Sequence, residues 1–422
     1  MPRRLATSNA TSAAFSLSLW ATLALINASN KLLLTGATGF LGGAIAASLI
    51  SSRRWRSVLL LVRAGNPREG RDRVLEVLAR FGVPRRLWNH LSPVQIVCGD
   101  LCETSGFRSD RRLREVSDVI NAAALATFAN HSDLWRINVE GTLEFARVMS
   151  AVATLRRFVH VGTGISCGVQ APSPVAEGYE PGEDVQHLVR YAESKLEGER
   201  RLRRDLPSLP LVVVRPSTIV GHTQLGCKPS PSIFWVFRVG RALRAFTCAG
   251  EDRVDVVPVD YCAKAILQLL DKPELKHDMY HVSAGAQWSC TFAEIDAAIA
   301  AALGTPPTDD YKQVDYETLA AKQDHFEELF GPCIRFVMLR AIKLYGEFAR
   351  LNMLFDNRRL MAEGVPPPPR FTQYAGLCAA TSENATIAEQ MGYDFKGLIT
   401  LRRSSVLPSK GRHKEARRFN LP

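Results

Sequence analysis

A short apolar run followed at once by closely spaced glycines limits how this chain can fold more than any other feature. Lys31 to Leu34 (KLLL) lead into TGATGFLGGAIAASLI, where Gly36, Gly39 and Gly42 are spaced three apart. The run predicts a buried strand, and Ala44 to Ile50 the helix after a tight turn. Glycines here let backbone N–H groups approach a pyrophosphate at a helix N-terminus, where the helix dipole favours anions. A strand, turn and helix that bind a dinucleotide are therefore expected.

Strand-like and helix-like segments alternate after this turn. One expected helix begins at Asn138 (NVEGTLEF), between two apolar runs. Strands that alternate with helices predict an α/β fold, a Rossmann-type doubly wound parallel sheet with its ligand crevice at the carboxyl ends of the strands. The further expected strands are Val58–Val62, Val94–Val97, Asp118–Ile120, Arg157–Val161 and Leu211–Val214.

The residue after the second strand bears on the choice of dinucleotide. An acidic residue at this point holds the ribose 2′-hydroxyl in NAD-binding folds, whereas an arginine suits a 2′-phosphate. Arg63 occupies this point and favours NADPH, because a guanidinium forms paired hydrogen bonds with phosphate oxygens. A solvated surface arginine is the alternative interpretation. Arg73, in the next expected helix, is a second candidate.

The ends of the third and fourth strands are also candidate cofactor sites. Asp100 and Leu101 follow the third strand, where they are placed to flank an adenine ring. The fourth strand ends in Asn121, Ala122 and Ala123, small residues that permit close approach of a cofactor. Both segments are expected at the ligand crevice.

The candidate catalytic residues lie beyond the fifth strand. Tyr191 and Lys195 (YAESK) are four residues apart on a predicted helix and share one face. A nearby ammonium stabilises phenolate, so we expect Lys195 to lower the pKa of Tyr191 from about 10 toward working pH. Thr163, at the end of the fifth strand, is placed to hydrogen-bond the same substrate oxygen. The three side chains predict acid–base chemistry on a carbonyl group.

These motifs together resemble the extended short-chain dehydrogenase/reductases. The resemblance rests on TGATGFLG, the NAAA turn, the Thr163, Tyr191 and Lys195 set, and VVVRPSTIVG. Within that superfamily, LLLVRA, GDL, YAESKLEGE and DVVPVDYCAKAI resemble the thioester reductase domains of carboxylic acid reductases and nonribosomal peptide synthetases, and the fatty acyl-CoA reductases. The resemblance covers residues 31–285. It departs from the pattern at Gly162, where many relatives carry serine, although Thr163 keeps the needed hydroxyl.

The resemblance implies NADP(H) as cofactor. No metal is expected, because the sequence has no CxxC motif and no Cys/His cluster with metal-ligand spacing. Arg63 would hold the 2′-phosphate, and Asp100 and Leu101 the adenine. Lys195 would contact the nicotinamide ribose as well as tune Tyr191. The remaining implied cofactor contacts are Gly36, Thr38, Gly39, Phe40, Leu41 and Gly42 around the pyrophosphate, Asn121, Ala122 and Ala123 after the fourth strand, and Pro216 and Ser217 in VVVRPSTIVG.

The resemblance also implies a reaction and a partner. Hydride would pass to the carbonyl carbon of an acyl thioester, held on coenzyme A or on a phosphopantetheine carrier protein. Tyr191 would donate the proton and, with Thr163, stabilise the developing oxyanion. The product would be an aldehyde, or an alcohol after a second hydride transfer.

The expected domain division follows the same reasoning. Phe234, Trp235 and Phe237 lie in an aromatic-rich amphipathic stretch, and are candidates for an acyl pocket or for ordinary core. The stretch from Ile334 to Leu354 is expected to pack on the cap, to close over an acyl chain or to touch a membrane surface as a peripheral contact. The expected parts are a leader or N-terminal helix (1–30), a Rossmann NADP-binding domain (31–221, with a return over 252–285), a mostly helical substrate-binding cap (222–251 and 286–400) and a basic disordered tail (401–422).

The net charge of +11, from 53 basic and 42 acidic residues, belongs mostly to the two ends. Seven basic residues against one acid between Arg402 and Arg418, together with Arg3 and Arg4, supply eight of these charges. The body is left with +3 and no recognition motif, so nucleic acid is not an expected partner. In the cap, basic residues are candidates for the phosphates of coenzyme A or of a carrier arm, with a solvated helix face as the alternative. These are Lys228, Arg238, Arg241 and Arg244.

Cysteine usage and the N-terminus bear on location. The nine cysteines are sparse and irregular, as expected for reduced thiols in an intracellular protein. Residues 5–30 carry no charge and resemble a signal or transit peptide, or an amphipathic helix beside the first strand. A soluble dinucleotide as electron source favours the cytoplasm, with targeting to an organelle as the alternative.

Other functions stay open at this point. A dihydroflavonol-like ketone reductase, a hydroxysteroid-type dehydrogenase or a nucleotide-sugar epimerase would share the fold and the catalytic set. An epimerase would keep tightly bound NAD and would not need Arg63, and a ketone reductase would not act on thioesters. A non-catalytic nucleotide-binding protein is a further alternative, opposed by the intact Thr163, Tyr191 and Lys195.

Overall fold

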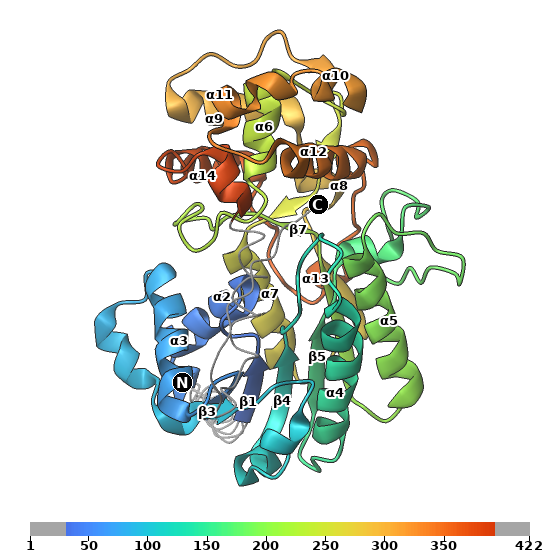
Figure 1. Cartoon of the computed structure of the whole chain (residues 1–422). Coiled ribbons are helices and arrows are strands. Elements are labelled where there is room, and N and C mark those ends of the chain that lie inside the picture. Colours follow the sequence, from blue (N-terminus) through green and yellow to red (C-terminus); the bar gives the residue numbers. More distant parts are fainter. Residues whose placement is uncertain (1–30, 393–422) are drawn as a thin grey trace, which may run out of the picture.

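Seven parallel strands form the central sheet of residues 31–392, the part of the chain that the computed structural model describes (Figure 1). Their order across the sheet is β11-β6-β5-β4-β1-β2-β3. The order reverses between β1 and β4, and this is the switch point at which doubly wound sheets bind ligands. The strands are β1 (Lys31–Thr35), β2 (Val58–Val62), β3 (Ile96–Cys98), β4 (Val116–Asn121), β5 (Arg157–Val161), β6 (Leu211–Pro216) and β11 (Met279–Val282).

Helices cover both faces of this sheet, as Figure 1 shows. Successive residues of β1 point to opposite faces, so Leu32 and Leu34 join one buried apolar cluster and Leu33 joins the other. The first cluster packs against α2 (Phe40–Ser51), α3 (Pro67–Arg80) and α7 (Val259–Asp271). On the other face lie the π-helical turn η6 (Arg136–Gly141), α4 (Thr142–Ser150) and α5 (Arg190–Asp205). The expected α/β class and doubly wound sheet are confirmed.

Several expected element boundaries were wrong: β4 begins two residues earlier than expected and β6 ends two residues later, and α2 and β3 differ as follows. Helix α2 begins at Phe40 rather than at Ala44, because the chain turns into the helix immediately after Gly39. Strand β3 is displaced toward the C-terminus, since Pro93–Gln95 form the 3₁₀ turn η3, with the proline in the first turn, where its missing N–H costs nothing. The correction to α2 brings Phe40 and Leu41 into the first turn of the helix.

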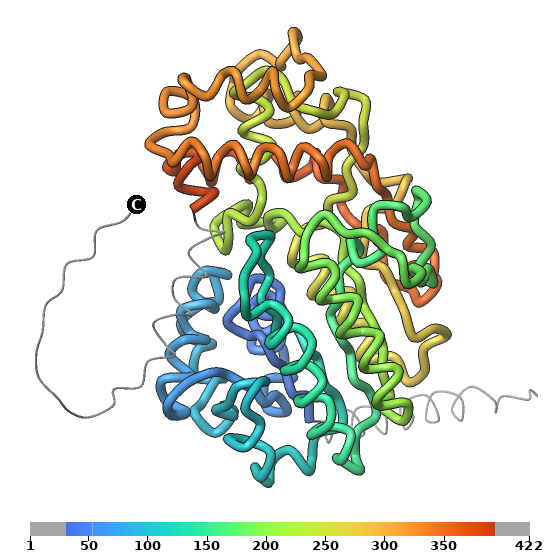
Figure 2. Tube along the Cα trace, turned by 45° about the vertical axis from the view of Figure 1, so that its right-hand side comes forward, coloured from blue at the N-terminus to red at the C-terminus, as the bar shows by residue number. Residues whose placement is uncertain are grey.

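A mostly helical cap lies above the carboxyl edge of the sheet, as expected. Its own apolar cluster joins Trp235, Phe326 and Ile342 among others. In the view of Figure 2, the long helix α12 runs along the border between the cap and the sheet. The cap helices are α6 (Trp235–Leu243), α8 (Gly285–Trp288), α9 (Phe292–Leu303), α10 (Tyr316–Ala320), α11 (Phe326–Phe330), α12 (Arg335–Arg350) and α14 (Ala375–Ala380), and α13 (Arg358–Ala362) contacts β11.

Three two-stranded pairs complete the described structure. They are β7 (Thr218–Ile219) with β10 (Val256–Val257), β8 (Ala245–Phe246) with β13 (Lys312–Gln313), and β9 (Arg253–Val254) with β12 (Cys290–Thr291). Within residues 31–392, every helix is too short or too polar to cross a bilayer. The expected leader and basic tail lie outside the described residues.

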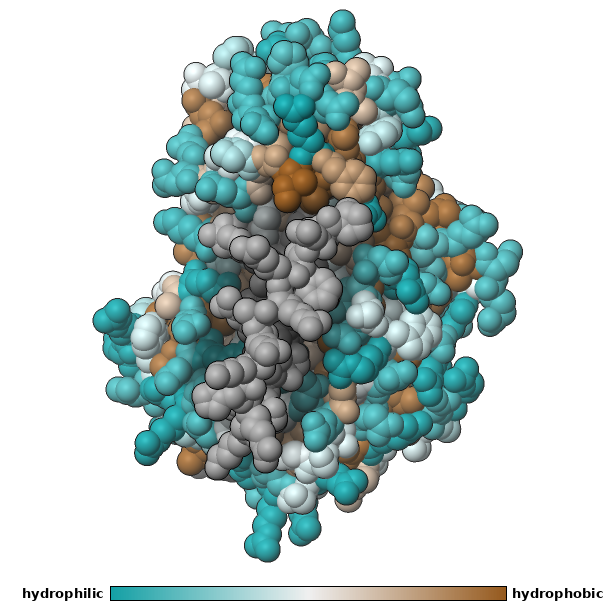
Figure 3. Space-filling view, viewed as in Figure 1, coloured by the Kyte–Doolittle hydropathy of each residue, from teal (hydrophilic) through white to brown (hydrophobic). Residues whose placement is uncertain are grey.

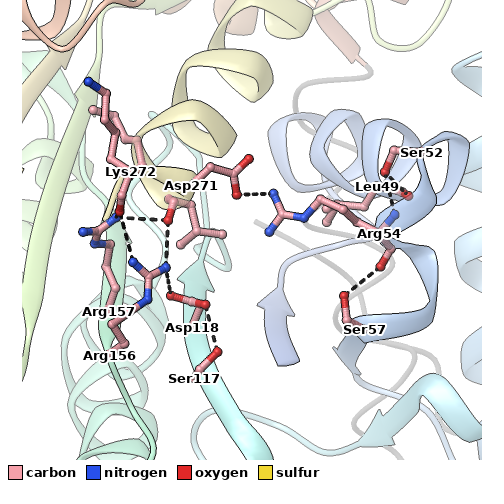
Figure 4. A network of polar contacts seen from close by, with 12 residues as sticks. Leu49, Ser52, Arg54, Ser57, Ser117, Asp118, Arg156, Arg157, Asp271 and Lys272 are labelled. Carbon is pink, nitrogen blue, oxygen red and sulfur yellow. Dashed lines mark hydrogen bonds and ion pairs between the residues drawn. The ribbon is translucent and has the colours of Figure 1, made fainter. Parts of the chain in front are cut away.

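Arginine side chains bind the C-terminal end of α7 to the amino ends of strands in the sheet, on the side away from the cap (Figure 4). Arg157 donates to the carbonyl oxygens of Leu269, Leu270 and Lys272 at 2.6–3.0 Å. Arg156 bonds the buried carboxylate of Asp118 at 2.6 Å. Cations at the C-terminus of a helix satisfy free carbonyls and interact favourably with the helix dipole, so these bonds hold the end of α7 against the beginning of β5.

Candidate active site

Glycines shape the turn between β1 and α2. Gly36 has φ +74°, and a Cβ atom there would lie 2.7 Å from the backbone of Ala122. A Cβ atom on Gly42 would lie 2.2 Å from the carbonyl oxygen of Gly36. The glycine turn therefore lies in direct contact with the end of β4, and the first helical turn of α2 lies in direct contact with the glycine turn. A side chain at Gly36 or at Gly42 would prevent these contacts.

The first turn of α2 presents unused hydrogen-bond donors. The N–H groups of Phe40, Leu41 and Gly42 have no hydrogen-bond partner among the described residues, and no side chain caps the helix. No acidic residue lies in this turn. All three residues line a large cavity. Free amides at a helix N-terminus that face a cavity fit the pyrophosphate of a dinucleotide.

Charged residues meet where β2 and β3 end. The guanidinium of Arg63 lies 3.8 Å from the carboxylate of Asp100, and both side chains remain nearly half exposed. Arg73 donates to the backbone carbonyl of Arg63, so the two arginines are neighbours. The side chain of Leu101 is buried in the core, so only its backbone is available to a ligand. The structure thus gathers the three residues expected around the adenosine part, with Arg73 beside them.

Asn121 differs from the other strand-end residues because its side chain is tied into the core. Its Oδ1 accepts a hydrogen bond from Thr35 at 2.7 Å, and its Nδ2 lies 3.3 Å from Nδ1 of His160. The Thr35 hydroxyl in turn accepts the N–H of Ala123 at 3.1 Å. Asn121 therefore links β1, β4 and β5 beneath the crevice, and Ala122 lines the cavity instead.

One cavity of about 1020 Å³ joins the sheet edge to the cap. Most of the expected site residues lie in its walls, and the others lie beneath or beside it. Those in the walls are Gly39, Phe40, Leu41, Gly42, Ala122, Thr163, Tyr191, Lys195, Pro216 and Ser217. Those outside the walls are Gly36, Thr38, Arg63, Asp100, Leu101, Asn121 and Ala123.

Tyr191 and Lys195 lie in the first turns of α5 and face the end of β5. The side chain of Lys195 is 2% exposed, and its Nζ lies 3.5 Å from Nε2 of the buried His160. Burial lowers the pKa of Lys195 to about 8, although Glu199 opposes this shift. Burial, together with the negative charge of Glu199, raises the pKa of Tyr191 to about 12.

The expectation that Lys195 would lower the pKa of Tyr191 was therefore wrong in direction. Withdrawal of the phenol from water disfavours its charged form, and this effect dominates here. At neutral pH Tyr191 holds its proton, and Lys195 is mostly in its charged form. The site consequently holds one hydrogen-bond donor and one cation, both in the cavity wall.

A buried ion pair behind these residues was missed from the sequence. Arg215 on β6 donates to Oε2 of Glu199 from Nε at 2.9 Å and from Nη2 at 2.6 Å. Both side chains are at most 3% exposed. Glu199 lies four residues after Lys195 on α5. This helical spacing is the one signal in the sequence that could have identified Glu199 as a neighbour of Lys195.

The cap side of the cavity is apolar. Of the three aromatic residues expected as candidates for an acyl pocket, only one lies in its wall. Phe237 lines the cavity, whereas Phe234 and Trp235 are 0% and 1% exposed and belong to the cap core. One face of α12 supplies much of the remaining wall, and the space-filling view shows apolar side chains gathered at this border (Figure 3). The α12 residues in the wall are Phe336, Val337, Arg340, Ala341, Leu344, Tyr345, Phe348 and Ala349.

Phe128, in the loop after β4, joins the two sides of the cavity. Its ring lies 6.1 Å from the ring of Tyr191, 5.4 Å from that of Tyr345 and 5.2 Å from that of Phe348. One aromatic side chain thus contacts both the candidate acid and helix α12. Nothing in the sequence around Phe128 indicated this role.

The basic residues expected to meet phosphates are mostly engaged elsewhere. Arg238 donates to the carbonyl oxygens of Ser382 and Ala385, Arg241 pairs with Asp296 at 2.5 Å, and Arg244 pairs with Asp310. Neither these three arginines nor the exposed Lys228 line the large cavity. The arginines that do so are Arg190, Arg253 and Arg340. Between residues 31 and 392, no cluster of His, Cys, Asp and Glu could hold a metal ion.

The family model described as "Male sterility protein" matches residues 34–266, more than half of the chain. The chain belongs to this family. It is 25% identical over 269 residues to the non-canonical nonribosomal peptide synthetase hkm10 of Aspergillus hancockii, across 60% of this chain and 26% of that protein. It is 28% identical over 258 residues to the aldehyde reductase lnaA of Aspergillus flavus, across 57% of this chain and 24% of that protein. The male sterility family member described here thus spans about a quarter of the length of these relatives.

Solved structures agree on the fold. The terminal R domain from the myxalamid PKS-NRPS biosynthetic pathway superposes with a TM-score of 0.68 at 20% identity, across 84% of this chain and 91% of that one. At this identity the likeness establishes the fold alone. The resemblance drawn from the motifs, to an extended reductase of the thioester reductase branch, is confirmed at the level of family and fold.

Proposed function

We propose that this chain is an NADPH-dependent reductase that converts an acyl thioester to an aldehyde, with an alcohol as the product of a second reduction. One observation carries the proposal. A single cavity joins the free amides of α2, the side chains of Thr163, Tyr191 and Lys195, and the apolar face of α12. The free amides suit a dinucleotide, the three polar side chains suit a reacting carbonyl, and the apolar face suits an acyl group.

The cofactor's dihydronicotinamide ring, when bound, supplies the hydride. The amides of Phe40, Leu41 and Gly42 hold the pyrophosphate, and Lys195 binds the adjacent ribose. Arg63, with Arg73 beside it, holds the 2′-phosphate, for which planar guanidinium groups suit the oxygen geometry. Pro216 and Ser217 form the cavity wall on the side of β6.

Tyr191 serves as the proton donor. Because its pKa is raised to about 12, the phenol is protonated at neutral pH and can transfer its proton to the oxygen that gains charge during reduction. Thr163 donates a second hydrogen bond to that oxygen, and the ammonium of Lys195 stabilises the phenolate left behind. The resulting hemithioacetal then loses its thiol: the C–S bond breaks, the hydroxyl proton passes to sulfur, and an aldehyde is released.

The substrate is proposed to be bound to coenzyme A or to a phosphopantetheine carrier protein. Arg190 and Arg340 are exposed cations in the cavity walls, suited to the phosphate of a pantetheine arm. One of the relatives is named as a nonribosomal peptide synthetase, which supports a carrier-bound substrate. Another is named as an aldehyde reductase, which supports the second reduction, from the aldehyde to an alcohol.

The test is a substrate panel with product identification. The purified chain is given NADPH or NADH and, in separate reactions, acyl-CoA and acyl-pantetheine thioesters, ketones and UDP-sugars. We expect NADPH oxidation with the thioesters and not with the ketones or UDP-sugars. One equivalent of free thiol should be released per thioester, and the other product should be the aldehyde, or the alcohol where a second NADPH is consumed. Reduction of ketones without thiol release, or epimerisation of a UDP-sugar, would overturn the proposal.

A further inference from the structure

A second cavity of about 480 Å³ lies inside the cap, between α6 and α9. The segments 246–251 and 307–313 also line it, and it opens to the surface where Glu251, Pro307 and Asp309 are exposed. Val236, Phe237 and Phe292 line this cavity and the large one alike. The two spaces are therefore neighbours that share one wall of three apolar side chains.

Small residues create this second space. Gly240 lies inside α6, where a glycine costs about 1 kcal/mol relative to alanine, yet a Cβ atom there would meet nothing closer than Phe246 at 3.9 Å. A Cβ atom on Gly250 would lie 3.6 Å from that of Ala293. The cavity is thus open because glycines and alanines stand where larger side chains would fit.

Several of the polar groups in its walls have partners within the protein. Arg241 and Asp296 form an ion pair at 2.5 Å, and Asp296 also accepts the N–H of Thr308 at 2.6 Å. The hydroxyl of Tyr311 donates to the carbonyl of Cys248 at 2.8 Å. Glu251 and Asp309 are exposed where they line the cavity. On the side shared with the large cavity, Val236, Phe237 and Phe292 offer apolar surface, which favours a hydrocarbon group there.

Phe237 separates the two cavities. Its ring lies 6.1 Å from that of Phe292 and 5.1 Å from that of Phe371, and its side chain is only half-buried. A change in the position of this ring would connect the space beside α12 with the space between α6 and α9.

We propose that the second cavity receives the distal, apolar end of the substrate's acyl group, with Phe237 and Phe292 as the gate that sets which chain lengths enter. This inference rests on the proposed thioester reductase function. It makes Gly240 and Phe237 specificity-determining residues, remote from the reacting carbonyl.

The test uses acyl-N-acetylcysteamine thioesters with acyl chains of increasing length, and measures both their affinity for the protein and their reduction with NADPH. Affinity should rise about fourfold for each methylene that enters the cavity, the fold-change that corresponds to about 0.8 kcal/mol. Gly240→Leu fills the space, so it should abolish the rise in affinity for the longest acyl groups and leave the affinity for short acyl groups unchanged. Phe237→Ala opens the gate, so the rise in affinity with each methylene should continue to longer acyl groups.

Ala297→Leu is the matched control, because it adds similar bulk to an exposed position of α9 outside the cavity. It should keep the chain-length profile of the unaltered protein. If Gly240→Leu and Phe237→Ala also keep that profile, or weaken all chain lengths equally, the second cavity is not an acyl site. If chain length controls affinity but no thioester is reduced, the proposed function fails while the assignment of the cavity stands.

Discussion

A Cβ atom on Gly162 would lie 2.1 Å from Oε1 of Glu199. The carboxylate therefore occupies the space that a side chain beside Thr163 would need. Arg215 holds the other oxygen, Oε2, while Oε1 is buried and has no hydrogen-bond partner in the described part of the chain. This contact gives a physical reason for glycine at position 162: a buried carboxylate, fixed by an arginine, leaves no room for a side chain.

The first prediction concerns the stability of this arrangement. Gly162→Ala should lower the free energy of unfolding by about 1–3 kcal/mol, because the methyl group displaces a buried carboxylate from its arginine. Urea unfolding measures the change. Gly106→Ala is the control, since a Cβ atom there meets nothing within 4 Å. Equal stability of the two variants would show that Glu199 can move aside without loss.

The second prediction concerns the proton donor. Tyr191→Phe keeps the ring that packs on Phe128 but removes the hydroxyl, so kcat for thioester reduction should fall by about 10²–10⁴-fold. NADPH affinity and the unfolding midpoint should not change. Steady-state kinetics and cofactor titration measure these quantities. A variant with full activity would remove Tyr191 from the mechanism.

The third prediction concerns pH. Lys195 has a pKa of about 8 and Tyr191 one of about 12, so a rise in pH first removes the ammonium while the phenol stays protonated. The value of kcat/KM for NADPH should therefore fall as the pH rises through about 8. The groups that face Lys195 are Glu199 on the same helix and the neutral His160 on β5.

Lys195→Arg provides the check on this assignment. An arginine stays charged over the whole range, so the fall near pH 8 should disappear even if the maximal activity is lower. A profile that still falls near pH 8 in this variant would assign the titration to another group.

Local sequence patterns predicted the parts of the site that a few neighbouring residues determine. The glycine turn at Gly36, the strand-end position of Arg63 and the shared helix face of Tyr191 and Lys195 all follow from short spacings. The sheet follows in the same way, because each strand is a short apolar run between helices. The start of α2 was missed because Gly39 and Phe40 can belong to a turn or to a helix until the packing of Gly42 is known.

Contacts between distant residues were not predictable from such patterns. Arg241 and Arg244 looked like candidate phosphate ligands, yet their partners are carboxylates more than fifty residues away in the chain. The pKa of Tyr191 depends on how deeply the phenol is buried, and the loop that carries Phe128 contributes to that burial. Spacing along one helix carries no information on either point.

The fourth prediction concerns cofactor preference. Arg63→Asp should weaken the binding of NADPH by about 10–100-fold, because hydrogen bonds between charged groups contribute about 1.5–3 kcal/mol. The binding of NADH should weaken much less. Arg80→Asp makes the same charge change at an exposed position at the end of α3 and should affect neither cofactor. Fluorescence titration of both cofactors measures the ratio. Equal losses for NADPH and NADH would show that Arg63 does not hold a 2′-phosphate.

The last prediction concerns the link between the sheet and the cap. Phe128→Ala removes a ring that contacts Tyr191 on one side and Tyr345 and Phe348 on the other. The cavity then loses part of its wall, so KM for the thioester should rise about tenfold while kcat changes less, because the ring binds substrate without entering the proton transfer. The lost aromatic pairs should also lower the free energy of unfolding by about 1–3 kcal/mol.

Phe336→Ala is the matched control, since Phe336 also lines the cavity but is 67% exposed. It should change the free energy of unfolding by less than about 0.5 kcal/mol. Steady-state kinetics and urea unfolding on both variants separate the two effects. If Phe128→Ala lowers stability but leaves KM unchanged, the ring holds α12 in place without contributing to the substrate surface. A rise in KM that far exceeds the one in Phe336→Ala places Phe128 in the wall that the acyl group touches.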